Sequence, residues 1–120
     1  MQFDPMRPIW QQVMGDIETS IAAGKRKPGE KLPGVRDFAF AAEVNPNTMQ
    51  RALTELEEEG LLFTRGTSGR FVCEDPARIR AAKEQLLREA AEAYLAICAR
   101  LGVGRDEAAD ILKGVKDEHE

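Results

Sequence analysis

The segment at residues 44–51, VNPNTMQR, constrains the fold more than any other part of the chain. Asn45 is a favoured residue for capping a helix, and Pro46 suits the first helical position, where no backbone N–H is needed. With about 100° of rotation per residue, one side of the following helix is apolar and is formed by Met49, Ala52, Leu53 and Leu56. The opposite side is polar and carries Asn47, Gln50, Arg51 and Thr54. The segment therefore predicts an amphipathic helix whose exposed face is rich in hydrogen-bonding side chains.

The chemistry of this polar face indicates a DNA-reading helix. Asn, Gln and Arg are the residue types that form paired hydrogen bonds with adenine and guanine edges in the major groove. Acidic residues occur only toward the other end of the helix, at Glu55 and at residues 57–59. A helix of this polarity can enter a groove tip-first, as recognition helices do.

The surrounding sequence predicts a winged helix-turn-helix. Apolar residues spaced by four predict a helix over residues 9–23, and a short helix follows at 35–42. A tight turn at 43–45 leads into the capped helix, which ends at Gly60. Two β-type runs, 61–65 and 70–73, flank a glycine-containing loop and predict a hairpin, whose tip at Gly66–Gly69 is the wing. Since an isolated hairpin is barely stable, we expect it to lie against the helices.

The last third of the chain predicts a two-helix tail. Helices are expected at residues 77–101 and 105–116, separated by glycines. Because their broad apolar stripe exceeds what two helices can bury alone, we expect it to form a dimer interface, with packing onto the chain's own winged domain as the alternative. The predicted interface residues are Ile79, Leu86, Leu87, Tyr94, Ile97, Leu101, Ile111, Leu112 and Val115. The predicted architecture is mainly α with a small β-hairpin: a winged helix-turn-helix DNA-binding domain at 1–75 and a helical dimerisation tail at 76–120.

The charge balance leaves two classes of function open. The net charge is −4, which is unusual for a DNA-binding protein, but residues 60–73 contain no acid, and DNA binding needs only a local basic footprint. The rival is a winged-helix module that binds proteins and not DNA. The polar helix tip argues against it, because a protein-binding helix usually presents apolar or aromatic anchors.

Several other classes are not supported by the sequence. No apolar run approaches the roughly 18 residues of a membrane span, and the first residues lack an export signal, so a cytoplasmic protein without membrane contact is expected. Cys73 and Cys98 are expected to be free thiols, and His119 to be disordered. No metal-ligand spacing, phosphate loop or catalytic arrangement is present, so we expect no metal, no cofactor and no enzymatic activity.

Several blocks of the sequence resemble the GntR family of bacterial transcriptional regulators. These blocks, within residues 8–72, are PIWQQV, IAAG, PGEKLP, VR, VNPNT, LEEEGLL and GRFV. The short tail is similar to that of the YtrA subfamily, in which the tail serves dimerisation. The resemblance implies a homodimer that binds a double-stranded DNA operator and represses a small operon, often one that encodes a transporter. A small-molecule effector, still unidentified, would need a pocket between subunits near Tyr94 and Cys98.

The resemblance and the residue pattern together nominate a set of DNA-contacting residues. Helix contacts are expected from Arg36, Asn45, Asn47, Thr48, Gln50 and Arg51, and wing contacts from Arg65, Gly66, Thr67, Ser68, Gly69 and Arg70. For Asn45 a purely structural cap is the stronger alternative, and the others could be ordinary exposed residues. The chain departs from the family at Gly34, often Ser, and at Pro46 and Gln50, often Arg. Trp10 stands where Tyr is usual and is interpreted as a packing change.

Overall fold

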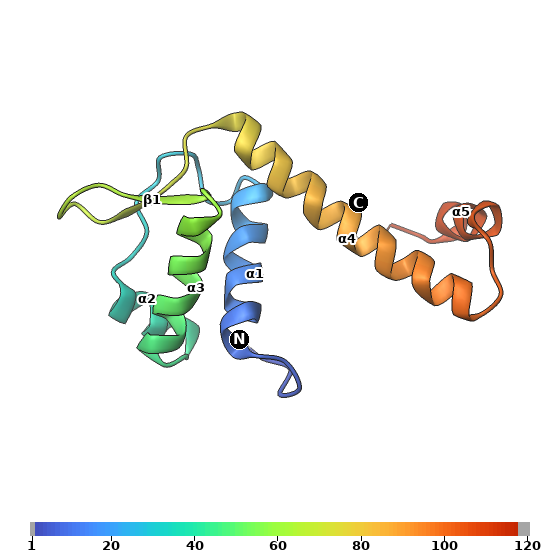
Figure 1. The fold of residues 1–120 in the computed structure, drawn as a ribbon, viewed down its shortest axis with the longest axis horizontal. Helices are drawn as coiled ribbons and strands as arrows, with labels where there is room; N and C mark the ends of the chain where they lie inside the picture. The colour runs from blue at the N-terminus through green and yellow to red at the C-terminus, as the bar shows by residue number, and fades with distance from the viewer. Residues whose placement is uncertain (1, 118–120) are drawn as a thin grey trace. The chain divides into compact units, whose positions relative to one another are not determined.

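The computed structural model describes residues 2–117, and it confirms the predicted class, mainly helical with one small hairpin (Figure 1). The elements run in the order α1 (Ile9–Ala22), α2 (Val35–Ala42), α3 (Pro46–Glu58), β1 (Leu62–Thr64), β2 (Arg70–Val72), α4 (Pro76–Arg100) and α5 (Arg105–Gly114). The chain divides into two compact units inside α4, the first ending at Glu84 and the second beginning at Gln85. The predicted domain boundary lies earlier, at the start of α4.

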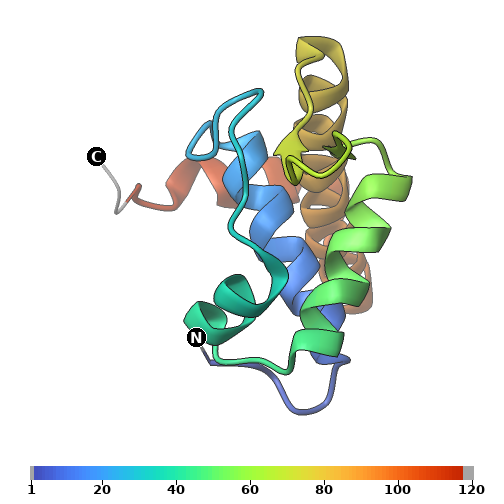
Figure 2. The same cartoon turned by 90° about the vertical axis from the view of Figure 1, so that its left-hand side faces the viewer.

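The first unit is built on three helices. α1 and α3 lie side by side, and α2 packs on α3 (Figures 1 and 2). The apolar side of α3 is fully buried: Met49, Ala52, Leu53 and Leu56 are at most 1% exposed. They meet Val13, Ile17 and Ile21 of α1, whereas Ile9, the first member of the predicted stripe, is 43% exposed at the start of the helix. Burial of this common core fixes which face of α3 remains available to a ligand.

The turn between α2 and α3 depends on one strained residue. Glu43 follows α2 in the left-handed conformation, with φ of 58°, and it alone among the described non-glycine residues has a positive φ. Its backbone N–H and that of Val44 donate to carbonyls near the end of α2, which closes the helix before the chain turns. Left-handed backbone is unfavourable for residues with a Cβ, so the surrounding contacts hold this conformation.

The hairpin has the predicted strands and one additional segment. β1 and β2 pair antiparallel, with Leu62 opposite Val72 and Phe63 opposite Phe71. The loop before α2 also pairs with β2: the Leu32 N–H donates to the Arg70 carbonyl at 2.9 Å, and Lys31 bridges to Phe71. The sequence predicted only a loop there, because Pro and Gly surround the pairing residues and the partner strand is distant in the chain.

The beginning of α4 belongs to the first unit. Asp75 caps this start, since its Oδ1 accepts a hydrogen bond from the Ala77 N–H. Ile79 packs against the core of the first unit, and Ala82 is buried there. Ile79 was predicted to lie in a subunit interface, whereas in the structure it packs against the core of its own first unit. The reason is that the chain leaves β2 beside the core, so the first turns of α4 pass directly over it.

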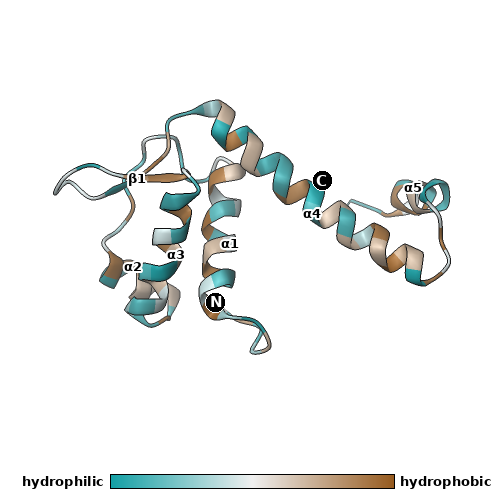
Figure 3. Ribbon diagram, viewed as in Figure 1, coloured by the Kyte–Doolittle hydropathy of each residue, from teal (hydrophilic) through white to brown (hydrophobic). Residues whose placement is uncertain are grey.

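The second unit contains the remainder of α4 and α5. The Tyr94 hydroxyl donates a hydrogen bond to the Ala108 carbonyl at 2.7 Å, and Cys98 and Ala108 are buried. Apolar residues recur along both helices (Figure 3). Leu86 is half-buried, and the large exposed apolar residues are Leu87, Ile97, Leu101, Ile111, Leu112 and Val115. Within residues 2–117, no helix is both long and apolar enough to span a bilayer.

Candidate nucleic-acid interface

The start of α3 is fixed by its cap. The Asn45 side-chain oxygen accepts a hydrogen bond from the Asn47 N–H at 2.7 Å, and Pro46 occupies the first turn. The structural interpretation of Asn45 is therefore confirmed, and a DNA contact would have to use its remaining groups. The first turn of α3 contains no acidic residue. The positive end of the helix dipole is therefore not neutralised by a carboxylate of the same helix.

The exposed face of α3 presents the polar side chains that the sequence predicted. Asn47, Gln50 and Arg51 are exposed, and Thr48 is half-buried. Gln50 Nε2 donates to the Thr54 hydroxyl at 3.2 Å. This bond uses one of two amide N–H donors and leaves the amide oxygen as an acceptor, so Gln50 retains the donor–acceptor pair needed for an adenine edge.

Arg36 lies at the second position of α2, and its side chain is exposed. Gly34 occupies the cap position of this helix without a side-chain hydrogen bond. The departure from Ser at this position therefore removes a capping group. The first backbone N–H groups of α2 therefore receive no hydrogen bond from a side chain at position 34. Arg36 lies beside them, and its long cationic side chain is suited to contact a phosphate.

The wing tip is an exposed turn with an arginine at its base. Gly66 and Gly69 have positive φ, and the Ser68 N–H donates to the Arg65 carbonyl. The Arg65 guanidinium lies 5.4 Å and 5.6 Å from the ring centres of Phe63 and Phe71, which stack on each other. Arg65 is thus held by aromatic faces, while its side chain remains exposed beside Gly66, Thr67, Ser68 and Gly69.

Arg70 differs from the other predicted contacts. Its Nε lies 3.4 Å from Glu57 Oε1, and the Thr64 hydroxyl donates to the same carboxylate oxygen. The side chains of Arg70 and Glu57 are only 18% and 29% exposed. The structure therefore shows Arg70 as a link between the wing and α3, and a phosphate would compete with Glu57 for it. The sequence did not indicate that Glu57 holds Arg70 and Thr64, because these residues are distant from it in the chain.

Lys31 is a basic residue that the sequence-based site omitted. It is exposed on the segment that pairs with β2, and its Cε lies 3.2 Å from where a Cβ on Gly69 would stand. A cleft of about 440 Å³ separates the start of α2 from the wing and is lined by Lys31, Leu32, Pro33, Gly34, Val35, Thr64, Ser68, Gly69 and Arg70. The sequence shows Lys31 only as one charge in a loop, because its pairing with β2 is a tertiary contact.

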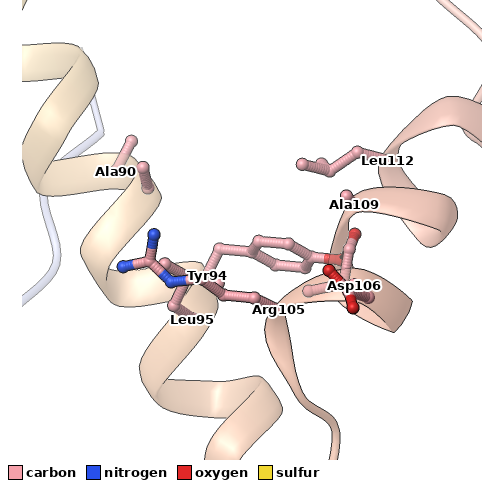
Figure 4. Close-up of a pocket in the computed structure, with 9 residues that line it drawn as sticks. Ala90, Tyr94, Leu95, Arg105, Asp106, Ala109 and Leu112 are labelled. Carbon is pink, nitrogen blue, oxygen red and sulfur yellow. Dashed lines mark hydrogen bonds between the residues drawn. The ribbon is translucent and has the colours of Figure 1, made fainter.

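The second unit contains a separate apolar cavity of about 590 Å³ between α4 and α5 (Figure 4). Tyr94, Leu95, Ala109 and Leu112 contribute to its lining, with Arg105 and Asp106 among the lining residues. Desolvation raises the pKa of the Tyr94 phenol above its ordinary value of 10.0, and the neighbouring Cys98 thiol raises it further. Of the two residues expected near an effector pocket, Tyr94 lines this cavity, whereas the buried Cys98 does not. In the part of the chain that the structure covers, no cluster of three acidic, His or Cys residues could hold a metal ion.

Comparison with known proteins decides the family. The model of the family described as bacterial regulatory proteins, gntR family, matches residues 10–72. The chain belongs to the GntR family. Its members are transcriptional regulators that bind DNA, not enzymes, and the matched residues run from Trp10 through the wing. The capped α3, the turn and the hairpin described above are thus the family's winged helix-turn-helix.

Relatives of this GntR protein extend the likeness into the tail. The HTH-type transcriptional regulator YhcF of Bacillus subtilis is 35% identical over 115 residues, which cover 96% of this chain and 93% of that protein. The transcriptional repressor YtrA of the same species is 34% identical over 104 residues, 80% of each chain.

Solved structures agree with the fold. A GntR family regulator from Listeria monocytogenes covers 95% of this chain and all of that chain, with a TM-score of 0.90 and 33% identity. The DNA-binding domain of AraR, solved in complex with operator ORX1, matches 61% of this chain and 93% of that domain, with a TM-score of 0.56 and 28% identity. The second of these likenesses lies within a domain that was crystallised on DNA.

Proposed function

We propose that this protein is a homodimeric, sequence-specific repressor that binds a pseudo-palindromic DNA operator. The observation that carries the proposal is the geometry of α3, whose core-facing side is at most 1% exposed while Asn47, Gln50 and Arg51 stand exposed on the other side. A helix fixed in this way presents the residue types that read base edges and contact phosphates. Repression would follow from blocking polymerase, so the function requires no catalytic residue.

The exposed residues of the proposed DNA-binding site fall into two groups with different roles. Gln50 keeps a free donor and acceptor and would read a base, with Asn47 and Thr48 near the helix tip. Arg36, Arg65 and Lys31 are exposed cations on three other segments and would contact phosphates, which set register and orientation without reading sequence. The wing, at Gly66–Gly69, would lie in the minor groove beside the site.

The exposed apolar residues of the second unit support dimerisation. Leu101 is 76% exposed, Val115 66% and Leu87 62%, and packing such side chains against a second copy would remove their apolar surface from water. Two copies joined here would present two α3 helices to successive major grooves. A dimer with two-fold symmetry then matches an operator whose half-sites mirror each other.

The regulated genes are also proposed by likeness. The relative YtrA is named a repressor, which supports repression here. The resemblance to the YtrA subfamily supports control of a small operon that encodes a transporter, in the cytoplasm where bacterial DNA lies. A small-molecule effector would bind in the apolar cavity between α4 and α5.

A mobility-shift titration on DNA from upstream of the gene tests the proposal. We expect a discrete complex, and for about six to ten phosphate contacts a loss of ~10³- to 10⁵-fold in affinity between ~50 and ~200 mM salt. Selection of binding sites from a random duplex library should yield an inverted repeat. Absence of any complex at low salt would contradict DNA binding and favour the protein-binding alternative, and selection of a single unpaired half-site would contradict the dimer.

A further inference from the structure

Trp10 and Arg51 form a contact between two helices that the proposed function has not used. The Arg51 guanidinium carbon lies 4.1 Å from the centre of the Trp10 ring. Trp10 is half-buried at the second position of α1, and Arg51 is exposed on α3. A guanidinium over an indole face is held by its charge and by stacking, which fixes an otherwise flexible side chain.

The surroundings of this contact suit an anion. A surface groove of about 410 Å³ is lined by Pro8, Ile9, Trp10, Asn47, Thr48 and Arg51, none of which is acidic. α1 and α3 both lack acidic residues in their first turns, and both lining segments come from those first turns and the residues beside them. The positive ends of two helix dipoles and one fixed guanidinium therefore share the same groove.

We propose that Trp10 is a positioning residue, which holds Arg51 for contact with a DNA phosphate beside the base-reading Gln50. The inference rests on the proposed DNA-binding function. A guanidinium stacked by its face keeps its in-plane N–H donors free, and these can form the paired hydrogen bonds that a phosphate accepts. The contact with Trp10 turns Arg51 toward α1, about 100° around α3 from Gln50. Arg51 therefore lies at the edge of the site, where it would contact a phosphate, while Gln50 would contact the bases.

A double-mutant cycle on the full chain tests the proposal with a mixed-sequence 30-bp duplex as the probe, because a phosphate contact does not depend on sequence. Arg51→Ala should weaken binding about ten-fold or more at ~50 mM salt. It should also lower the slope of log affinity against log salt by about 0.9 for each recognition helix. Trp10→Leu should weaken binding by about two- to five-fold. In the Arg51→Ala protein, the same Trp10→Leu change should cause no further loss.

Two measurements separate positioning from a merely structural role. Trp10 is the only tryptophan in the chain, so its fluorescence reports directly on this contact: addition of the duplex should change the emission of the wild type, and Arg51→Ala should reduce that change. Trp10→Phe, which keeps an aromatic face, should retain most of the affinity and the full salt slope. Thermal unfolding of each variant shows whether the fold persists.

The outcomes are distinct. An equal loss from Trp10→Leu with and without Arg51, or an unchanged salt slope in Arg51→Ala, would overturn the inference while DNA binding stands. If Trp10→Leu unfolds, the fluorescence of Trp10 still decides, because an emission change on adding the duplex that is undiminished in Arg51→Ala would overturn the inference. A wild type that binds no duplex refutes the proposed function itself.

Discussion

At the scale of single residues, the site separates side chains that can read bases from those that can only attract phosphate. Gln50 is exposed, and its bond to Thr54 leaves one amide donor and the amide oxygen free. Arg65 lies against two aromatic rings at the base of the wing and is also exposed. Substitutions at Gln50 and Arg65 should therefore have different effects on DNA binding.

We expect Gln50→Ala to change base preference at one position in each half-site, by about 1–3 kcal/mol if the contact is paired. Arg65→Ala should instead weaken all sequences about equally and lower the salt slope. Site selection from a random library, repeated for both variants at two salt concentrations, measures these effects. If the two variants select the same altered sequence, the assignment of helix face and wing is incorrect.

The left-handed backbone at Glu43 indicates that a glycine there should stabilise the protein. Its φ of 58° is unfavourable for any residue with a Cβ, and glycine removes that cost while adding some entropy to the unfolded chain. Glu43→Gly should therefore stabilise the protein by about 0.5–1 kcal/mol and raise the unfolding midpoint by a few degrees. Glu43→Ala is the matched control, since it removes the carboxylate and keeps the strained backbone. An equal gain in both variants would assign the effect to charge.

At the scale of elements, the wing is attached to α3 through Glu57, which accepts from Thr64 and pairs with Arg70. Glu57→Gln should lower stability by up to about 1 kcal/mol, because it removes the charge that Arg70 faces. The freed Arg70 should in turn strengthen binding to mixed-sequence DNA at low salt and steepen the salt dependence.

Glu58→Gln is the control for this experiment, because Glu58 is the exposed neighbour and the change in net charge is the same. Parallel salt titrations and thermal melts of the two variants compare them. Identical behaviour would show that only net charge matters and that the Glu57 pair does not restrain Arg70.

At the scale of the whole molecule, the two compact units predict where the chain can be divided. Because Ile79 and Ala82 belong to the core of the first unit, a fragment of residues 1–84 should fold, and one of residues 1–75 should be less stable by about 2 kcal/mol. Circular dichroism melts compare the two. Equal stability would place the boundary at the start of α4, as the sequence suggested.

The dimer is predicted to depend on the second unit. Ile97→Glu, at a 53% exposed position on α4, should give a monomer by light scattering and lower operator affinity by ~10²- to 10⁴-fold, because the two half-sites are no longer linked. Ala99→Glu, an exposed position about 160° around the helix, is the control and should remain dimeric. A dimeric Ile97→Glu protein would place the interface elsewhere.

Local signals in the sequence were sufficient for the elements and for most of the candidate site. The cap at Asn45, the period of the apolar residues and the glycines around the wing each act within a few residues, so α3, its exposed face and the hairpin could be predicted from them. The dimerisation tail and the DNA contacts remain predictions.

Only the tertiary structure decided which distant residues meet. Lys31 pairs with β2, Glu57 holds Arg70, Ile79 joins the core of the first unit and Trp10 stacks on Arg51. No local pattern indicates any of these contacts. The physical reason is that periodicity and capping report the conformation of a segment, whereas contacts between segments depend on how buried faces bring the elements together. The sequence alone therefore determined what each segment is, and the packing decided which side chains are free to meet DNA.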